Sequence, residues 1–128
     1  YFIKNNKLEK NIKLINFKDN IYPYYVAAKG FILTSLWEDP GFVLIEAGFC
    51  RLPIFSSNSK PGPAELIIDN FNGINFENNN ISSFIKKFSI YKDNLKNKKL
   101  LVNNMKYLKN FTIFNHYNQF YNLLTQNH

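Results

Sequence analysis

The sequence predicts an α/β fold in which a parallel sheet is flanked by helices. Short apolar runs bounded by turn residues recur along the chain, and segments with helical spacing of apolar residues separate them. Such close alternation favours parallel strands, because each helix returns the chain to the same edge of the sheet. Helical spacing also fills the chain from residue 81 onward, which predicts C-terminal helices beyond the sheet.

The first half of the chain predicts two strands around a short helix. Residues 12–15 form a β-prone run, and Asp19 or Asn20 can cap a helix that continues to Ala28. Residues 31–34 are a continuous apolar run between turn signals. A run of this kind suits a parallel strand that is buried on both faces.

The middle of the chain continues the alternation. A helix opens at Gly41 and runs to Cys50, a strand covers residues 52–55, and a loop covers residues 56–62. Another helix begins at Pro63, where proline is tolerated in the first turn. An Asn-Gly turn at residues 72–73 leads to a short strand at residues 74–76. Three helical segments follow, at residues 81–88, 95–108 and 114–124.

Length and composition exclude several classes of protein. At 128 residues the chain is the size of one domain, and 45% apolar residues are too many for a disordered tail. It contains no apolar stretch of 18 residues and no N-terminal signal segment, so a membrane span is not expected. The single cysteine, Cys50, favours a reducing cytoplasmic compartment.

Charge is divided unevenly along the chain. The formal net charge is +7, but residues 30–80 carry two basic and six acidic side chains, whereas both flanks are basic. Eight of the basic side chains lie in the C-terminal part of the chain, after residue 80, namely Lys86, Lys87, Lys92, Lys96, Lys98, Lys99, Lys106 and Lys109. They suit contact with an anionic membrane surface, although a solvated helix face is the simpler interpretation. No nucleic-acid docking motif accompanies them, so we expect no nucleic-acid partner.

The candidate ligand site lies where the strands end. In an open parallel sheet, ligands bind outside the carboxyl ends of the strands. The loop after residues 31–34 contains Glu38, and Glu46 follows about one turn inside the next helix. Between them, the N–H groups of Gly41, Phe42 and Val43 are first-turn donors that can bind an anion.

Simpler interpretations of these residues exist. Glu38 could be a solvated loop residue, and Asp39 could cap the helix. Glu46 is harder to explain in this way, because a carboxylate among apolar neighbours is costly without a hydrogen-bond partner. A carboxylate facing a cleft suits a polyhydroxylated ligand, since it can accept from two neighbouring hydroxyls.

Several ordered motifs resemble those of retaining GT-B glycosyltransferases of the large family 4. Residues 35–47, SLWEDPGFVLIEA, resemble its Glu-x7-Glu signature. The strand-like segment 50–54, the Gly-Pro-x-Glu segment 61–67, the Asn-Gly turn and the segment 21–35 also match in order and spacing. The similarity is strong over about residues 10–77 and weak in the C-terminal helices. It implies the Rossmann-like, C-terminal half of a GT-B fold, which binds a nucleotide-sugar donor, as in polysaccharide biosynthesis.

The resemblance also implies roles for single residues. Glu46 matches the glutamate that bonds the ribose hydroxyls, and Glu38 matches the catalytic-site glutamate that contacts the transferred sugar. Gly41, Phe42 and Val43 match the backbone donors that hold sugar and diphosphate. In the second loop, donor binding is implied for Pro61, Gly62 and Glu65, although Glu65 can equally be a first-turn carboxylate favoured by the helix dipole.

No cofactor and no metal are expected, because the family's transfer uses no protein metal site. His116 and His128 lack the neighbours of a metal site and suit surface positions. Catalysis would be electrostatic, by positioning the donor and stabilising the leaving diphosphate.

The chain also departs from the family pattern. Arg51 stands where the family has a helix-ending glycine, which predicts a less ideal helix end. The acceptor domain and the first donor loop of the family have no counterpart in these 128 residues, so we expect a fragment that binds donor but does not turn over alone. A glycan or lipid-linked acceptor would bind the missing part, at the cytoplasmic side of a membrane. Two alternatives remain open: a GT-B sugar-nucleotide epimerase and a non-catalytic nucleotide-sugar-binding module.

Overall fold

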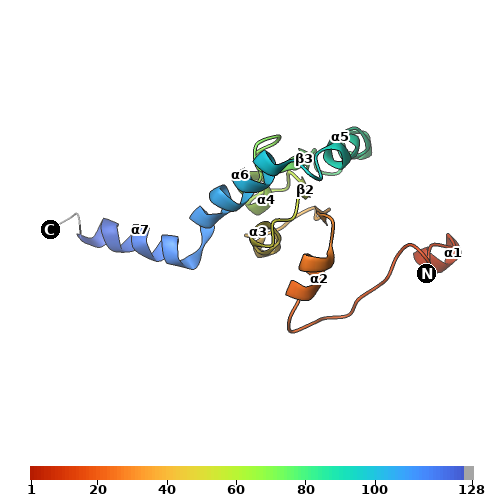
Figure 1. Cartoon of the computed structure of the whole chain (residues 1–128), viewed down its shortest axis with the longest axis horizontal. Coiled ribbons are helices and arrows are strands. Elements are labelled where there is room, and N and C mark those ends of the chain that lie inside the picture. The colour runs from red at the N-terminus through yellow and green to blue at the C-terminus, as the bar shows by residue number, and fades with distance from the viewer. Residues whose placement is uncertain (126–128) are drawn as a thin grey trace.

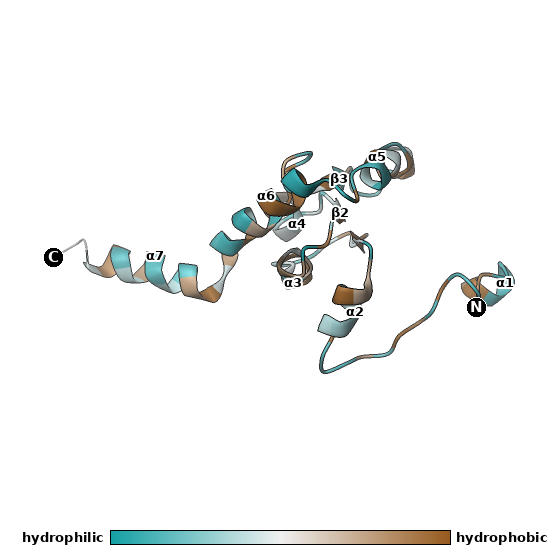
Figure 2. Cartoon of the chain, viewed as in Figure 1, coloured by the Kyte–Doolittle hydropathy of each residue, from teal (hydrophilic) through white to brown (hydrophobic). Residues whose placement is uncertain are grey.

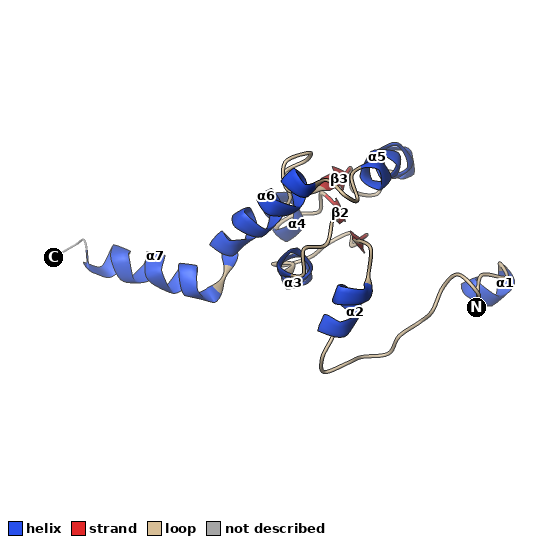
Figure 3. Ribbon diagram, in the orientation of Figure 1, coloured by secondary structure: helices blue, strands red, loops and turns tan. Residues whose placement is uncertain are grey.

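A computed structural model describes residues 1–125 and has an α/β architecture (Figures 1 and 3). Its strands are β1 (Phe31–Leu33), β2 (Ile54–Ser57) and β3 (Ile74–Phe76). Its helices are α1 (Phe2–Asn5), α2 (Tyr22–Ala27), α3 (Phe42–Phe49), α4 (Gly62–Leu66), α5 (Ile81–Asp93), α6 (Lys98–Leu108), the 3₁₀ helix η1 (Lys109–Phe111) and α7 (Ile113–Thr125). The predicted alternation of strands and helices, followed by C-terminal helices, is confirmed.

The sheet is parallel, as predicted, with the strand order β1-β2-β3. Phe31 pairs with Ile54 at the start of β1, and Phe55 pairs with Ile74 at the start of β3. Each crossover contains a helix, α3 between β1 and β2 and α4 between β2 and β3. All three strands therefore end at one edge of the sheet, and the loops that follow them lie there together.

Successive residues of β2 serve two separate apolar clusters. Ile54 packs in a cluster with side chains of α2, α3, α4 and α6. Phe55 points to the opposite face and belongs to a cluster with α5 and the start of α6. Its ring contacts Phe76 at 4.8 Å and Tyr91 at 5.2 Å between centroids. The alternation follows from the two-residue period of a strand and makes β2 the buried centre of the fold.

Helix α3 ends in a left-handed turn at Arg51. The Arg51 φ of 57° is the conformation that glycine adopts most readily. Its N–H bonds the Gly48 carbonyl at 3.0 Å, and the Leu52 N–H bonds the Ala47 carbonyl at 3.1 Å. This is the hydrogen-bond pattern of a Schellman motif. The helix end that was predicted to be less ideal is therefore a regular C-terminal turn, with an arginine in a position that disfavours side chains.

Three details of the predicted strands are wrong. Residues 12–15 form no strand, and their apolar side chains are largely exposed, because no neighbouring strand pairs with them. In β1 the side chain of Ile32 is 43% exposed, so this edge strand is not buried on both faces. Strand β2 runs from Ile54 to Ser57 instead of covering residues 52–55. Ser56 and Ser57 belong to it because Ser56 pairs with Leu33 and Asn75, and Ser57 pairs with Phe76. Their buried hydroxyls also find acceptors.

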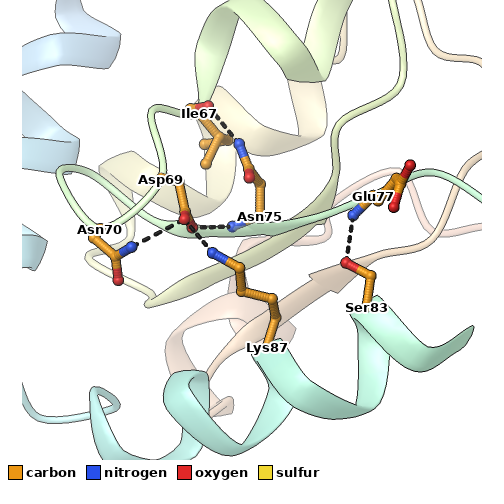
Figure 4. Close-up of polar contacts among 7 residues, drawn as sticks. All are labelled: Ile67, Asp69, Asn70, Asn75, Glu77, Ser83 and Lys87. Carbon is orange, nitrogen blue, oxygen red and sulfur yellow. Dashed lines mark hydrogen bonds and ion pairs between the residues drawn. The ribbon is translucent and has the colours of Figure 1, made fainter. Parts of the chain in front are cut away.

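A polar cluster joins the segment after α4 to β3 and α5 (Figure 4). One oxygen of Asp69 accepts from the Asn75 backbone at 3.0 Å, and the other pairs with Lys87 of α5. Asn75 in turn donates to the Ile67 carbonyl at 3.2 Å. These bonds tie α5 to the sheet on the side away from β1.

The two ends of the described chain extend away from the sheet (Figure 1). Helix α7 alternates hydrophobic and hydrophilic segments along its length (Figure 2), and its apolar side chains, such as Phe114 and Tyr117, are exposed. Among residues 1–125, no helix is both long and apolar enough to cross a membrane.

Candidate functional site

Hydrogen bonds join the three loops at the carboxyl edge of the sheet. The Ser57 hydroxyl, at the end of β2, donates to the Ser35 carbonyl after β1 at 2.7 Å. The Asn78 side chain, after β3, donates to the Leu36 carbonyl at 2.7 Å, and the Asn78 backbone donates to the side chain of Asn58 at 2.8 Å. The loop after β1, which carries Glu38, is therefore held by both neighbouring loops.

The predicted site residue Gly62 lies directly beneath the Glu38 loop. Its N–H donates to the Glu38 carbonyl at 3.1 Å. A methyl group added at Gly62 would come within 2.3 Å of the Pro40 carbonyl oxygen. The loop thus rests on the bare backbone at the start of α4. Pro61, the residue before it, is exposed.

Glu38 is half-buried and accepts a hydrogen bond from the Ser35 hydroxyl at 3.0 Å. Below it, the hydroxyls of Ser57 and Ser59 lie 3.2 Å apart and are buried. Because Ser57 also holds the Ser35 carbonyl, the loop position and the carboxylate orientation depend on the same small network of hydroxyls.

The first turn of α3 presents free backbone donors. Gly41 precedes the helix with a φ of 85°, and no side chain caps it. The interpretation of Asp39 as the helix cap is therefore wrong. Within residues 1–125, the N–H groups of Gly41, Phe42 and Val43 have no hydrogen-bond acceptor. At this end of the helix Phe42 is 63% exposed and Val43 is half-buried, whereas Gly41 is buried. The helix dipole and the free donors favour an anion.

Glu46 lies in the second turn of α3 and is half-buried. Its Oε2 accepts a hydrogen bond from the Tyr25 hydroxyl of α2 at 3.1 Å. Tyr25 is only 5% exposed, and this burial, together with the nearby Glu46 charge, raises the pKa of Tyr25 to about 12. The costly carboxylate inferred from the sequence thus has a protein partner for one of its two oxygens.

Glu65 is exposed in the first turn of α4. Its carbonyl accepts from the Tyr107 hydroxyl at 3.3 Å, but its carboxylate has no partner within residues 1–125. Both interpretations of Glu65, as a ligand contact and as a first-turn acid, therefore stay open.

An apolar pocket lies beside the start of α3. It has a volume of about 660 Å³, and its lining includes Phe42, Ile45 and Leu66 on one side and Ile113 and His116 on the other. His116 is exposed, and His128 lies outside the described residues. Among residues 1–125, no three His, Cys, Asp or Glu side chains are grouped as metal ligands would be.

The side chains that orient the two glutamates were not among the predicted site residues. Ser35 is three residues before Glu38, and that spacing was a signal that could have been used. Tyr25 is 21 residues before Glu46, and no local pattern links the two. Asn78 meets the Leu36 carbonyl across 42 residues, which only the folded sheet makes possible.

Comparison with known proteins gives a consistent result. The family model described as "Glycosyl transferases group 1" matches residues 1–111. Poly(ribitol-phosphate) alpha-N-acetylglucosaminyltransferase of Staphylococcus aureus is 32% identical over 85 residues, which are 66% of this chain and 17% of that protein. UDP-Gal:alpha-D-GlcNAc-diphosphoundecaprenol alpha-1,3-galactosyltransferase of Escherichia coli is 35% identical over 78 residues, 61% of this chain and 20% of that one.

The fold also has a close structural counterpart. The crystal structure of the C-terminal domain of a glycosyl transferase group 1 family protein (LpcC) from Francisella tularensis superposes with a TM-score of 0.68 at 21% identity. The match covers 88% of this chain and 60% of that one. The chain therefore has the fold of that C-terminal domain, and it spans about a fifth or less of the two curated relatives.

Proposed function

The chain belongs to the glycosyl transferases group 1 family, and we propose that it is the unit of such an enzyme that binds the nucleotide-sugar donor. The whole enzyme would transfer the sugar with retention of configuration. Its fold, that of a C-terminal domain of this family, supports this assignment. The named relatives are sugar transferases, and the name of the E. coli relative includes a UDP-sugar.

The observation that carries the proposal is the surrounding of the α3 N-terminus. Free N–H groups of Gly41, Phe42 and Val43 lie between a glutamate on the preceding loop and another one turn into the helix. A nucleotide sugar has matching parts, because its diphosphate is an anion and its ribose and sugar carry neighbouring hydroxyls. In this assignment Glu46 accepts from the ribose and Glu38 accepts from the transferred sugar.

The second loop completes the proposed site. The Gly62 N–H holds the Glu38 loop through the Glu38 carbonyl, and Pro61 is the exposed residue before it. Glu65 lies in the first turn of α4, with a carboxylate that has no partner among residues 1–125. Catalysis by these residues would be electrostatic: they position the donor, and the free N–H groups stabilise the negative charge of the leaving diphosphate.

For the whole enzyme, the proposal also includes the molecule that accepts the sugar. We infer a glycan or lipid-linked acceptor, since one relative is named for poly(ribitol-phosphate) and another for a diphosphoundecaprenol. Because this chain spans only 17% and 20% of those proteins, we expect it to bind donor without transferring sugar on its own. Sugar transfer by the purified chain would contradict this expectation.

Peripheral contact with an anionic membrane at the cytoplasmic face is part of the same proposal. Seven of the eight C-terminal lysines are exposed, whereas Lys87 is paired with Asp69. Co-sedimentation with anionic vesicles that disappears at high salt would support the contact, and absence of binding at low salt would refute it.

Titration calorimetry with the nucleoside diphosphates UDP, GDP and ADP and their sugars tests the donor site. Replacing Glu46 by Ala removes an acceptor of ribose hydroxyls, and a hydrogen bond to a charged group is worth about 1.5–3 kcal/mol, so affinity should fall by roughly 10- to 100-fold. Glu9→Ala is the matched control, because Glu9 is exposed and lies outside the site. No binding of any of these compounds to the native chain, or equal affinity of native and Glu46→Ala protein, would overturn the assignment.

A further inference from the structure

Tyr25 is absent from the residues assigned above, yet it is the side chain that holds Glu46. Its hydroxyl donates to Glu46 Oε2 at 3.1 Å from a different helix, α2. We propose that Tyr25 is a positioning residue for donor binding: it fixes one carboxylate oxygen of Glu46 so that the other accepts from the ribose hydroxyls. The inference rests on the proposed function and extends it by naming what orients the ribose-binding carboxylate.

The Tyr25 ring is fixed before any ligand arrives. It packs edge-on against Tyr22 and Phe31, with ring centroids 6.2 Å and 5.7 Å away. It also belongs to the apolar cluster that includes Leu44 and Ala47 of α3. Because the Tyr25 hydroxyl is anchored in this way, the Glu46 carboxylate that it bonds can adopt fewer orientations. Ordering a binding group before the ligand arrives reduces the entropy that is lost on binding.

The chemistry of the pair also suits this role. Because burial raises the pKa of Tyr25 to about 12, the phenol stays protonated and donates at any physiological pH. A phenol that donates occupies one oxygen of the carboxylate and leaves the negative charge in place. Glu46 thus keeps its second oxygen and its charge for two ribose hydroxyls.

A simpler explanation is that a buried phenol needs any acceptor. Tyr91 provides the comparison, because it is equally buried, its pKa is also raised to about 12, and its hydroxyl donates to the Pro53 carbonyl at 3.2 Å. Removing the Tyr91 hydroxyl leaves the Pro53 carbonyl with the Phe31 N–H, which donates to it at 2.9 Å. Removing the Tyr25 hydroxyl takes away the donor that holds Glu46 Oε2. Only Tyr25 contacts a residue of the proposed donor site, so the two variants separate positioning from structural support.

The experiment compares Tyr25→Phe with Tyr91→Phe by titration calorimetry, after circular dichroism and thermal melting have shown both to be folded. The ligands are whichever of UDP, GDP or ADP binds the native chain most tightly, and its 2′,3′-dideoxy counterpart. For Tyr25→Phe we expect the affinity for the ribonucleotide to fall about tenfold, equivalent to about 1.4 kcal/mol. The affinity for the dideoxynucleotide should stay unchanged, and Tyr91→Phe should bind both ligands like the native chain.

Glu46→Gln and the double variant Tyr25→Phe/Glu46→Gln complete a double-mutant cycle. The loss of ribonucleotide affinity in the double variant should be smaller than the sum of the losses in the two single variants, because both substitutions act through one carboxylate. Equal losses for the ribonucleotide and the dideoxynucleotide, no loss at all, or strictly additive losses would overturn the positioning role while leaving the donor site intact. If no nucleotide binds the native chain, the proposed function itself fails.

Discussion

Substituting Gly62 by Ala tests how tightly the Glu38 loop is seated on α4. The new methyl carbon would lie 2.3 Å from the Pro40 carbonyl oxygen and 3.0 Å from the Glu38 carbonyl oxygen, and both are backbone atoms that cannot rotate away. A relaxed contact between carbon and oxygen needs about 3.3 Å, so the loop must retreat by about 1 Å.

That retreat has a calculable cost. It lengthens the bond from the Gly62 N–H to the Glu38 carbonyl, now 3.1 Å, to about 4 Å, beyond hydrogen-bonding distance. Overpacking costs about 1–3 kcal/mol and the lost hydrogen bond about 1 kcal/mol, so the free energy of unfolding should fall by about 2–4 kcal/mol. Because Glu38 moves with the loop, nucleotide-sugar affinity should fall as well.

Urea denaturation followed by circular dichroism measures the stability, and calorimetry measures the affinity. Gly48→Ala is the matched control, because its methyl carbon would meet the Leu108 Cδ1 atom at 2.4 Å, the end of a side chain on α6 and not the backbone of the site loop. This variant also gains about 1 kcal/mol of helix propensity. It should lose less stability than Gly62→Ala and keep the native affinity. A Gly62→Ala protein within about 0.5 kcal/mol of native stability would refute the close packing of loop and helix.

Two further outcomes follow from the backbone and from the buried phenols. Replacing Arg51 by Gly should raise the free energy of unfolding by about 1 kcal/mol, because glycine adopts the left-handed turn without steric strain; a urea midpoint no higher than that of the native chain would show that the turn is not strained. The free energy of unfolding should also fall in alkali, because burial raises the pKa values of Tyr25 and Tyr91 from 10.0 to about 12. The two protonated phenols stabilise the fold fully below pH 10, and this contribution is lost as the pH rises to about 12. Melting temperatures recorded from pH 8 to pH 12 check this, and a Tyr25→Phe/Tyr91→Phe variant with the same pH profile as the native chain would contradict it.

Much of the fold follows from local pattern. The apolar runs of β1 and β3 and the Asn-Gly turn between α4 and β3 are set by neighbouring residues, and the structure has them where they were predicted. Residues 12–15 have the same β-prone composition, yet they form no strand. Whether such a run becomes a strand depends on a partner with which to share hydrogen bonds, and that information is not local.

The candidate site divides in the same way. The positions of Glu38, Gly41 and Glu46 on one loop and helix could be predicted, because they are close in sequence and the helix repeat relates them. Their orientation could not. Tyr25 reaches Glu46 from another helix, and Ser57 reaches the Ser35 carbonyl from another strand.

The sequence by itself determined which residues alternate between strand and helix, where the turns fall and which acidic and backbone groups gather after β1, since each of these depends on interactions within a few residues. Only the tertiary structure decided that β2 extends to Ser57, that α2 supplies the donor to Glu46 and that Gly62 supports the loop. Those outcomes depend on how parallel strands bring distant segments to one edge, where buried hydroxyls and N–H groups must find whichever acceptor lies nearest.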